Sequence, residues 1–498
     1  MNRKFNIFFA AMMTAIPLAA SGQPYRTVME RNLWNMGPGA VGMRQDTVSI
    51  SYAEAYGRYT GGGFRDTYEA VDSWDAGVRA ESTVHLQRFS MRGAAAFNQF
   101  WGNEMCGSIF LKPGFYPIDA QEFTPGRKSS QRYSFEGGVC IDLSDNWRIG
   151  AKAGFTSTNI AKRKDLRHTG YRLDLDVVPG IQYHNGDFAI GMNYIFRRNR
   201  ENENVEQVGT KVSSHYAFLE TGIAIGRYGL WEDSSLHLAE DGVKGFPVME
   251  NAHGVNLQVS AGGFYADAEF CFTSGEAGEK QFIWFRFPGN TAALRLGYAF
   301  SGRNIVRMSF CGNRQHNFET SLEKVTKGGV TTVEEIGSNR ILGREGFSVI
   351  PEYSHIGRKA EIRVKGFFES SDATASPMYP FLFKRNLIRY GADAGALLHL
   401  SPWDLGLTVG LALGRTKDET SSVGEDSGVI SAPYRYEEYD RAHIDFLTSP
   451  ALSLGMSARY NFKCRLYAET AAGIISRAGE PFYDRIRFSA TLKFGYNF

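Results

Sequence analysis

Long apolar runs are nearly absent from this 498-residue chain, and the one run that approaches the length of a membrane helix lies at the N-terminus. Because each membrane-spanning helix needs about 20 consecutive apolar residues, a polytopic helical membrane protein is excluded. Proline is scarce as well, at 16 residues, and charged residues make up only 22% of the chain. Disordered chains are rich in both, so a disordered protein is also excluded.

The chain lacks a clear excess of charge of either sign. It has 55 Lys and Arg residues against 53 Asp and Glu residues. Proteins that bind nucleic acids carry a basic excess that neutralises phosphates. We therefore expect no nucleic-acid partner.

Cysteine is sparse, with five residues whose nearest neighbours in the sequence are at least 34 positions apart. Neither a CxxC pair nor the spacing of a zinc site occurs. We therefore expect no metal and no cofactor. Two interpretations of the cysteines are open: isolated apolar side chains within strands, or one long-range disulfide formed after export.

The N-terminus has the pattern of an export signal. Two basic residues precede an apolar stretch over residues 5–20, and the small residues Ser21 and Gly22 follow it. This order predicts a secretory signal peptide over residues 1–22, which is removed on export. The alternative is an anchor helix that stays attached.

Glycine and aromatic residues are abundant, with 55 Gly, 36 Phe, 24 Tyr and 7 Trp. The clearest pattern is at the C-terminus, where apolar and polar residues alternate strictly over residues 486–498. A period of two residues predicts a strand with one apolar and one polar face. Such regularity over a long strand is typical of membrane barrels.

The same alternation recurs upstream in pairs of segments joined by short turns, and each pair predicts a β-hairpin. The hairpins cover residues 78–97, 135–155, 171–196, 255–272, 292–310, 347–368, 388–413 and 452–474. An opening strand over residues 48–59 and the terminal strand bring the total to about 18, within a range of 16–20. The range reflects residues 197–253, which form either a very long loop with its own hairpin or a poorly patterned extra pair of strands.

Long, polar connections separate the hairpins, for example over residues 197–209, 313–343 and 416–441. Outer-membrane barrels alternate in this way between short periplasmic turns and long extracellular loops. We therefore predict an all-β, antiparallel, up-and-down transmembrane β-barrel over residues 47–498. Residues 23–46 would form a plug in the lumen, a periplasmic tail or a simple lead-in.

The choice of a membrane barrel depends on which way the two faces point. Lipid cannot hydrogen-bond the backbone, so β structure crosses a membrane only as a closed sheet with its apolar face outward. A soluble secreted protein would bury the apolar face instead. Aromatic residues near the predicted strand ends, such as Trp147 and Trp403, fit the interfacial girdles of the membrane alternative.

The closing motif Phe494-Gly495-Tyr496-Asn497-Phe498 resembles that of the outer-membrane β-barrel proteins of Gram-negative bacteria. The chain is most similar to Bacteroidota outer-membrane barrels of unknown function. The resemblance implies a cell outer-membrane location, with membrane lipid and the barrel-assembly machinery as partners. It also implies that Phe494, Tyr496 and Phe498 are the residues that the assembly machinery recognises.

Charged residues fall on the predicted lumen face, where basic residues outnumber acidic ones. The lumen-lining candidates are Arg148, Lys152, Arg172, Asp174, Asp176, Arg295, Arg307, Arg363, Arg389 and Arg459. A basic lumen would concentrate anions, because low-dielectric walls focus the electric field. The alternative is that these charges pair across strands and only solvate the interior.

Two further chemistries have weak support. Acidic residues cluster over residues 416–441, but the Asp-x-Asp-x-Asp-Gly pattern of a calcium loop is missing, so a solvated acidic loop is the alternative. None of the ten histidines lies in an HExxH motif or near a GxSxG elbow. We expect no enzyme; a hydrolase would need a Ser-His or Asp-His pair at hydrogen-bond distance near the outer rim.

Two functions follow from these predictions. The first is a channel or transporter for a small hydrophilic solute, which would be anionic if the basic residues of the lumen do not pair with acidic ones. The second is a non-conducting accessory barrel that binds another outer-membrane protein or a surface ligand through its long external loops.

Overall fold

The computed structural model describes residues 23–45, 48–208, 215–223, 225–239, 243–328, 330–376, 382–421, 434–479 and 484–498. The predicted signal peptide, residues 1–22, lies outside these ranges. Within them, no helix is both long enough and apolar enough to cross a membrane.

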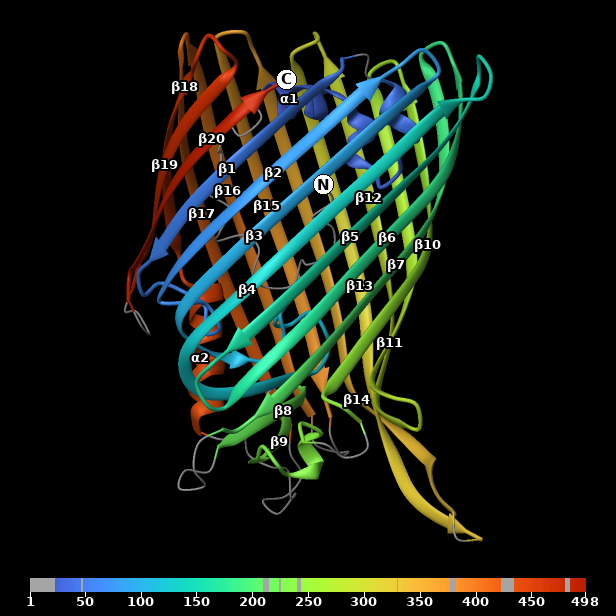
Figure 1. Ribbon diagram of the computed structural model, residues 1–498, viewed down its shortest axis with the longest axis vertical. Coiled ribbons are helices and arrows are strands. Elements are labelled where there is room, and N and C mark those ends of the chain that lie inside the picture. The colour runs from blue at the N-terminus through green and yellow to red at the C-terminus, as the bar shows by residue number, and fades with distance from the viewer. Residues whose placement is uncertain are drawn as a thin grey trace.

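Eighteen strands form a closed antiparallel barrel in which each strand pairs with its neighbours along the chain (Figure 1). β1 pairs with β20 and closes the ring, with Ala53 opposite Tyr496. The predicted up-and-down barrel and its strand number are confirmed. The barrel strands are β1 (Ile50–Gly61), β2 (Asp72–His85), β3 (Phe89–Ser108), β4 (Asp119–Asp142), β5 (Trp147–Lys162), β6 (Arg167–Asn185), β7 (Phe188–Glu206), β10 (Phe246–Ala261), β11 (Phe264–Glu279), β12 (Phe282–Phe300), β13 (Asn304–Lys327), β14 (Val330–Ile356), β15 (Ala360–Ala375), β16 (Leu382–Leu400), β17 (Trp403–Ser421), β18 (Ala451–Asn461), β19 (Leu466–Arg477) and β20 (Ile486–Asn497).

The apolar face of the barrel points outward. On β17, Leu405, Leu407 and Val409 expose between 40% and 48% of their surface, whereas the alternating Asp404 and Gly410 are buried. The same alternation runs around the ring, so large apolar side chains cover the outside and polar side chains the inside. This arrangement suits a sheet whose outer face meets lipid.

The two ends of the barrel differ. The short turns of the predicted hairpins, such as the one between Asn185 and Phe188, gather at the upper end of Figure 1 together with the C-terminus. The longer connections and α2 (Tyr434–Thr448) gather at the lower end. We call these the turn end and the loop end. In the predicted orientation the turn end faces the periplasm.

Three loop predictions are wrong in extent. Residues 313–343 were expected to form a loop, but β13 and β14 continue as a hairpin that projects past the rim, yellow in Figure 1. β-Branched residues such as Val325, Thr326 and Thr332 favour strand there. β7 likewise extends to Glu206, and residues 416–441 contain the end of β17 and most of α2.

Residues 197–253 contain a loop with its own hairpin, which was one of the two alternatives. β8 (Tyr216–Gly222) pairs with β9 (Ile225–Leu230), and β8 also pairs with the start of β4. The short helix η3 (Ser234–Leu236) follows. These elements lie outside the ring of barrel strands and cover part of the loop end (Figure 1).

Candidate functional site

The candidate site is the lumen together with the segments that close its two ends. All ten predicted lumen residues belong to the inward-facing rows of their strands. Nine of them form ion pairs, and the pairs are Arg148–Asp142, Lys152–Glu136, Arg172–Glu201, Arg172–Asp174, Asp176–Arg197, Arg295–Glu269, Arg307–Glu352, Arg363–Glu30 and Arg389–Glu369. The tenth, Arg459, donates to Asn461 at 2.9 Å and lies 3.7 Å from the ring centre of Tyr467. The contacts favour the interpretation that the lumen charges pair with one another.

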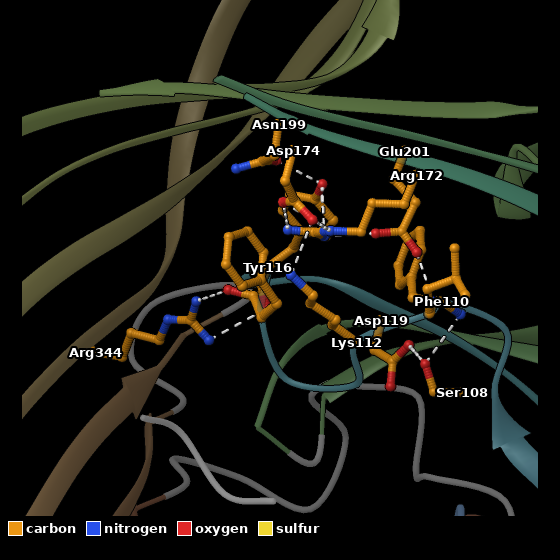
Figure 2. Close-up of polar contacts among 12 residues, drawn as sticks. Ser108, Phe110, Lys112, Tyr116, Asp119, Arg172, Asp174, Asn199, Glu201 and Arg344 are labelled. Atoms are coloured by element: carbon orange, nitrogen blue, oxygen red, sulfur yellow. Dashed lines mark hydrogen bonds and ion pairs between the residues drawn. The ribbon is translucent and has the colours of Figure 1, made fainter. Parts of the chain in front are cut away.

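The most deeply buried of these ion pairs lies near the loop end. The guanidinium of Arg172 on β6 donates to Glu201 on β7 at 2.7 Å and to Asp174 at 2.8 Å (Figure 2). The side chains of Arg172 and Glu201 expose 1% and 0% of their surface. Buried charges are tolerated only when they are paired and hydrogen-bonded, so Arg172 and its carboxylates stabilise one another.

A loop between β3 and β4 folds into the barrel and contacts this ion pair. We call residues 109–118 the mouth loop. The backbone N–H of Leu111 donates to Glu201 at 2.6 Å, and Lys112 forms an ion pair with Asp174 at 3.1 Å. The guanidinium of Arg172 lies 4.2 Å from the ring centre of Phe115. The mouth loop is therefore fixed on the β6–β7 side of the lumen.

A second arginine fixes the mouth loop from another wall. Arg344 on β14 donates to the backbone carbonyls of Gly114 at 3.0 Å, Phe115 at 2.5 Å and Tyr116 at 3.2 Å (Figure 2). Tyr116 also donates to Asn199 on β7 at 2.7 Å. Since β7 and β14 lie on different parts of the ring, the mouth loop spans the loop end between these two walls.

The mouth loop also contributes to a hydrophobic core. Ile109, Phe110 and Ile118 expose at most 4% of their surface and pack in one buried cluster with side chains of β8, η3, β10 and β12. The other buried members are Tyr116, Ala120, Leu166, Ala217, Leu219, Leu236, Leu238, Val243, Phe246, Val248, Ala277, Trp284, Phe285, Phe287 and Ile341. Burial of this size stabilises a fixed cap rather than a mobile loop.

The helix α2 covers another part of the loop end through polar contacts and through buried apolar side chains such as Tyr436, Phe446 and Leu447. Asp440 accepts from Arg385 on β16 at 2.6 Å, and Asp445 accepts from Arg477 on β19 at 3.0 Å. His443 approaches Asp66 in the β1–β2 connection, with 2.7 Å between Nδ1 and Oδ1. At the far side, Tyr436 donates to Glu220 on β8 at 2.8 Å. Ion pairs and hydrogen bonds thus hold α2 on several sides.

The Asp66–His443 pair has the distance that a hydrolase would need, and the contacts of its Nδ1 differ from those of a catalytic triad. Nδ1 of His443 also lies 3.3 Å from the hydroxyl of Tyr68, so the same ring nitrogen faces both partners. In a catalytic triad the acid and the nucleophile contact opposite nitrogens of the histidine. The pair joins α2 to the β1–β2 connection.

The N-terminal segment, residues 23–45, lies inside the barrel at the turn end, dark blue in Figure 1. It consists of α1 (Gln23–Arg31), η1 (Leu33–Met36) and η2 (Val41–Gln45). The indole N–H of Trp34 donates to Ser260 at 3.2 Å, and the ring centre of Trp34 lies 5.6 Å from that of Tyr265. The segment therefore occupies the lumen in this structure.

Two glycines let the N-terminal segment approach the wall. A Cβ on Gly37 would lie 1.8 Å from Nε2 of Gln258, and a Cβ on Gly39 would lie 2.2 Å from Oδ1 of Asn193. Gln258 and Asn193 are buried and hydrogen-bonded to each other at 2.8 Å, so they have little freedom to move away. Larger residues at the two glycine positions would push the segment off the wall.

No group of His, Cys, Asp and Glu side chains among the residues that the structure describes has the arrangement of a metal site. Within the acidic stretch, Asp418 and Asp440 both accept hydrogen bonds from Arg385, and Glu425 and Asp426 lie outside the described residues. The five cysteines are free thiols, of which Cys464 is exposed and Cys106 is buried.

The predicted assembly residues lie on the last strand. Phe494 and Phe498 expose 57% and 62% of their surface on the outside of the barrel, and the rings of Tyr496 and Phe498 are 4.8 Å apart. The backbone N–H of Phe498 donates to the carbonyl of Ser51 at 2.8 Å, next to the seam between β20 and β1. All three residues are thus part of the closing strand or adjoin it.

The sequence predictions missed the mouth loop, Arg344, Glu201 and α2. Both segments carry a signal in hindsight. The mouth loop has Ile109, Phe110, Phe115, Tyr116 and Ile118 within ten residues, too many apolar side chains for a solvated loop. In α2, Tyr436, Tyr439, Ala442, His443, Phe446 and Leu447 recur at helical spacing.

Residues 40–498 match the family described as Family of unknown function (DUF6850). The chain belongs to this family. A search of curated proteins found no match.

Three solved outer-membrane proteins are among the structures that match this chain. The FrpB iron transporter from Neisseria meningitidis is 7% identical, with 91% of this chain and 82% of that chain covered and a TM-score of 0.45. The ferric preacinetobactin receptor BauA from Acinetobacter baumannii is 7% identical, with 91% and 80% covered and a TM-score of 0.40. A loop-deletion mutant of OmpT from Vibrio cholerae is 9% identical, with 91% and 99% covered and a TM-score of 0.33. No functional statement rests on similarities this distant.

Proposed function

We propose that this protein is an outer-membrane channel or transporter for a small hydrophilic solute, exported by a cleaved signal peptide and closed in its resting state. The observation that carries the proposal is the nature of the closure. Segments of the chain itself block a wide barrel with a polar inner face. The N-terminal segment and α2 are held by ion pairs and hydrogen bonds together with small buried apolar clusters. The polar part of these contacts exchanges with water more readily than a packed apolar core.

The paired lumen charges argue against a solute chosen for negative charge. Nine of the ten predicted lumen residues already have partners of opposite charge. We propose that the solute is hydrophilic without a strong preference for anions. We also propose that the protein has no catalytic activity, that it depends on the barrel-assembly machinery, and that it originates from the Bacteroidota.

Conductance in planar lipid bilayers tests the proposal. We expect wild-type protein to be closed for most of the recording. A variant that lacks residues 24–45 and carries a Gly-Ser linker in place of residues 434–448 should show large, stable conductance steps, because both closures are removed. Single deletions are the matched controls and should conduct less. A folded double variant that never conducts would contradict the transport function.

A second candidate is an accessory barrel, and the projecting hairpin favours it. Beyond Glu319 and Leu342, β13 and β14 pair with each other and extend past the neighbouring strands. Ile336 on this hairpin exposes 64% of its surface. If the hairpin binds another outer-membrane protein, replacing residues 322–335 by a two-residue turn should abolish co-purification of that partner. Unchanged co-purification would exclude the hairpin as the contact.

A further inference from the structure

The helix α2 lies across the loop end and joins walls that are far apart in the ring. One side of the helix contacts Arg385 on β16 and Arg477 on β19. The opposite contacts are Tyr436 with Glu220 on β8, and Tyr439 with Cys106 on β3. A helix anchored on both sides of an opening blocks that opening for as long as its contacts hold.

The first of two titratable contacts is the pair between His443 and Asp66. Burial lowers the pKa of His443, but Asp66, at 2.7 Å, and the negative charge of Asp440 together raise it, so the net pKa is raised. The other groups that face His443 are Tyr68, Asp440 and Arg385. The ion pair is complete below the usual histidine pKa of about 6.5 and is lost as the pH rises through the raised value.

The second contact is between Tyr436 of α2 and Glu220 of β8. Burial, followed by the negative charges of Asp119 and Asp440, raises the pKa of Glu220 to about 8, although Tyr436 and Arg385 act in the opposite direction. Gln121 donates to the other oxygen of Glu220 at 2.9 Å. The docked state therefore favours a protonated Glu220, and this preference is lost as the pH rises from the unperturbed range through about 8.

We propose that α2 is a proton-controlled lid over the loop end, which the contacts of His443 and Glu220 keep closed at neutral pH and release at alkaline pH. The two groups lie on different elements. Asp66 favours a protonated His443, and the buried site favours a protonated Glu220 although the hydrogen bond from Tyr436 acts in the opposite direction. We expect the loss of either proton to weaken docking. The biological purpose of the lid depends on the proposed transport function, but the docking of α2 does not, so it is measured without transport.

The native thiol of Cys106 reports on α2, because it exposes 3% of its surface and contacts the hydroxyl of Tyr439. The test uses full-length mature protein in which Cys464 and Cys311 are replaced by Ser, and a membrane-impermeant maleimide. The labelling rate of Cys106 is divided by that of the exposed Cys464 in a matched Cys106→Ala protein, which corrects for the effect of pH on an exposed thiol. We expect this ratio to rise at least about tenfold between pH 6.5 and pH 9, since each unit of pKa shift is worth a factor of ten.

Two variants separate the lid from general unfolding. Glu220→Gln cannot ionise and should reduce the rise in the ratio, while Asp66→Asn should raise labelling already at pH 6.5. Heat-modifiable migration in gels confirms that each barrel is folded. A constant ratio in the wild type, or the same pH response in Glu220→Gln, would overturn the proposal. A pH-dependent ratio in a protein that never conducts would keep the lid and reject the transport function.

Discussion

The mouth loop and α2 both cross the loop end, but they are held by different kinds of contact. The mouth loop is fixed by a large apolar cluster and by two arginines that bind buried carboxylates and backbone carbonyls. The helix α2 is held by two smaller apolar clusters and by ion pairs in which its own carboxylates stay partly exposed: the side chains of Asp440 and Asp445 expose 20% and 29% of their surface. The mouth loop is therefore part of the folded core, whereas α2 is, in our proposal, a lid that can leave the loop end.

Because of this difference, we expect changes in the mouth loop to alter the stability of the barrel, and changes in α2 to alter the docking of the helix. Removal of a contact in the mouth loop leaves a buried charge or a cavity, and the whole barrel is destabilised. Removal of the arginine from an ion pair of α2 leaves a partly exposed carboxylate, Asp440 or Asp445, so we expect the cost to fall on docking of the helix. Variants that affect one property without the other sharpen the comparison, and variants that affect both equally contradict it.

The largest effect is expected from Arg172→Met. It leaves Glu201 and Asp174 without their central partner, and removal of one member of a buried ion pair costs about 3–5 kcal/mol. The measurement is the free energy of unfolding of the purified barrel in urea. Lys417→Met is the control, because its ion pair with Glu419 is solvent-exposed, and we expect no measurable change. Equal stability of the two variants would show that the mouth loop is not part of the core.

A large decrease in protein amount is expected from deletion of Phe498 or from Phe498→Asp. Both changes remove an exposed aromatic residue next to the seam, which we expect the assembly machinery to need. Quantitative blotting of outer-membrane fractions measures the amount of heat-modifiable barrel. In the molecules that do assemble, the maleimide labelling rate of Cys106 should equal that in the wild type. Normal amounts of barrel would contradict the assembly role.

A moderate effect on α2 alone is expected from Arg385→Met. Arg385 binds Asp418 and Asp440 together, and charged hydrogen bonds at this partial exposure contribute about 1–2 kcal/mol. Labelling of Cys106 should increase roughly 5- to 30-fold, with an unchanged free energy of unfolding. Arg286→Met, which removes the exposed ion pair to Glu335, is the matched control. If Arg385→Met lowered the free energy of unfolding as much as Arg172→Met does, the distinction between the mouth loop and α2 would be wrong.

The smallest effect is expected from ionic strength. Raising NaCl from 0.05 M to 0.5 M shortens the screening length several-fold and weakens partly exposed ion pairs. Labelling of Cys106 should then rise a few-fold. A thiol placed by Ala120→Cys in the apolar cluster, where this residue is fully buried, should stay protected. Salt-dependent labelling of both positions would indicate that the mouth loop and α2 move together.

The strand number could be predicted from the sequence because one face of each barrel strand points outward and the other points into the lumen. Each strand therefore carries its own alternation of apolar and polar residues. Residues such as Phe488 and Leu492 face outward, while Arg487 and Lys493 face inward, and this local alternation needs no knowledge of distant segments. The ten predicted lumen residues lie on the inward-facing rows for the same reason.

The closures were missed because they depend on contacts between distant residues. Arg344 reaches the mouth loop across about 230 positions of sequence, as its hydrogen bond to Gly114 shows. No local pattern marks Glu201 as the partner of Arg172, nor Asp66 as the partner of His443. Periodicity assigns a residue to a face, but it does not reveal which segment folds back onto that face.

The projecting hairpin has a mechanical consequence. β14 is one continuous strand from Val330 at the outer tip to Ile356 at the turn end, and Arg344 lies within it. A molecule that pulled or tilted the tip would act along this strand on the arginine that binds the mouth loop, through two irregularities in the β13–β14 register. The outermost and the most deeply buried parts of the loop end thus share one strand.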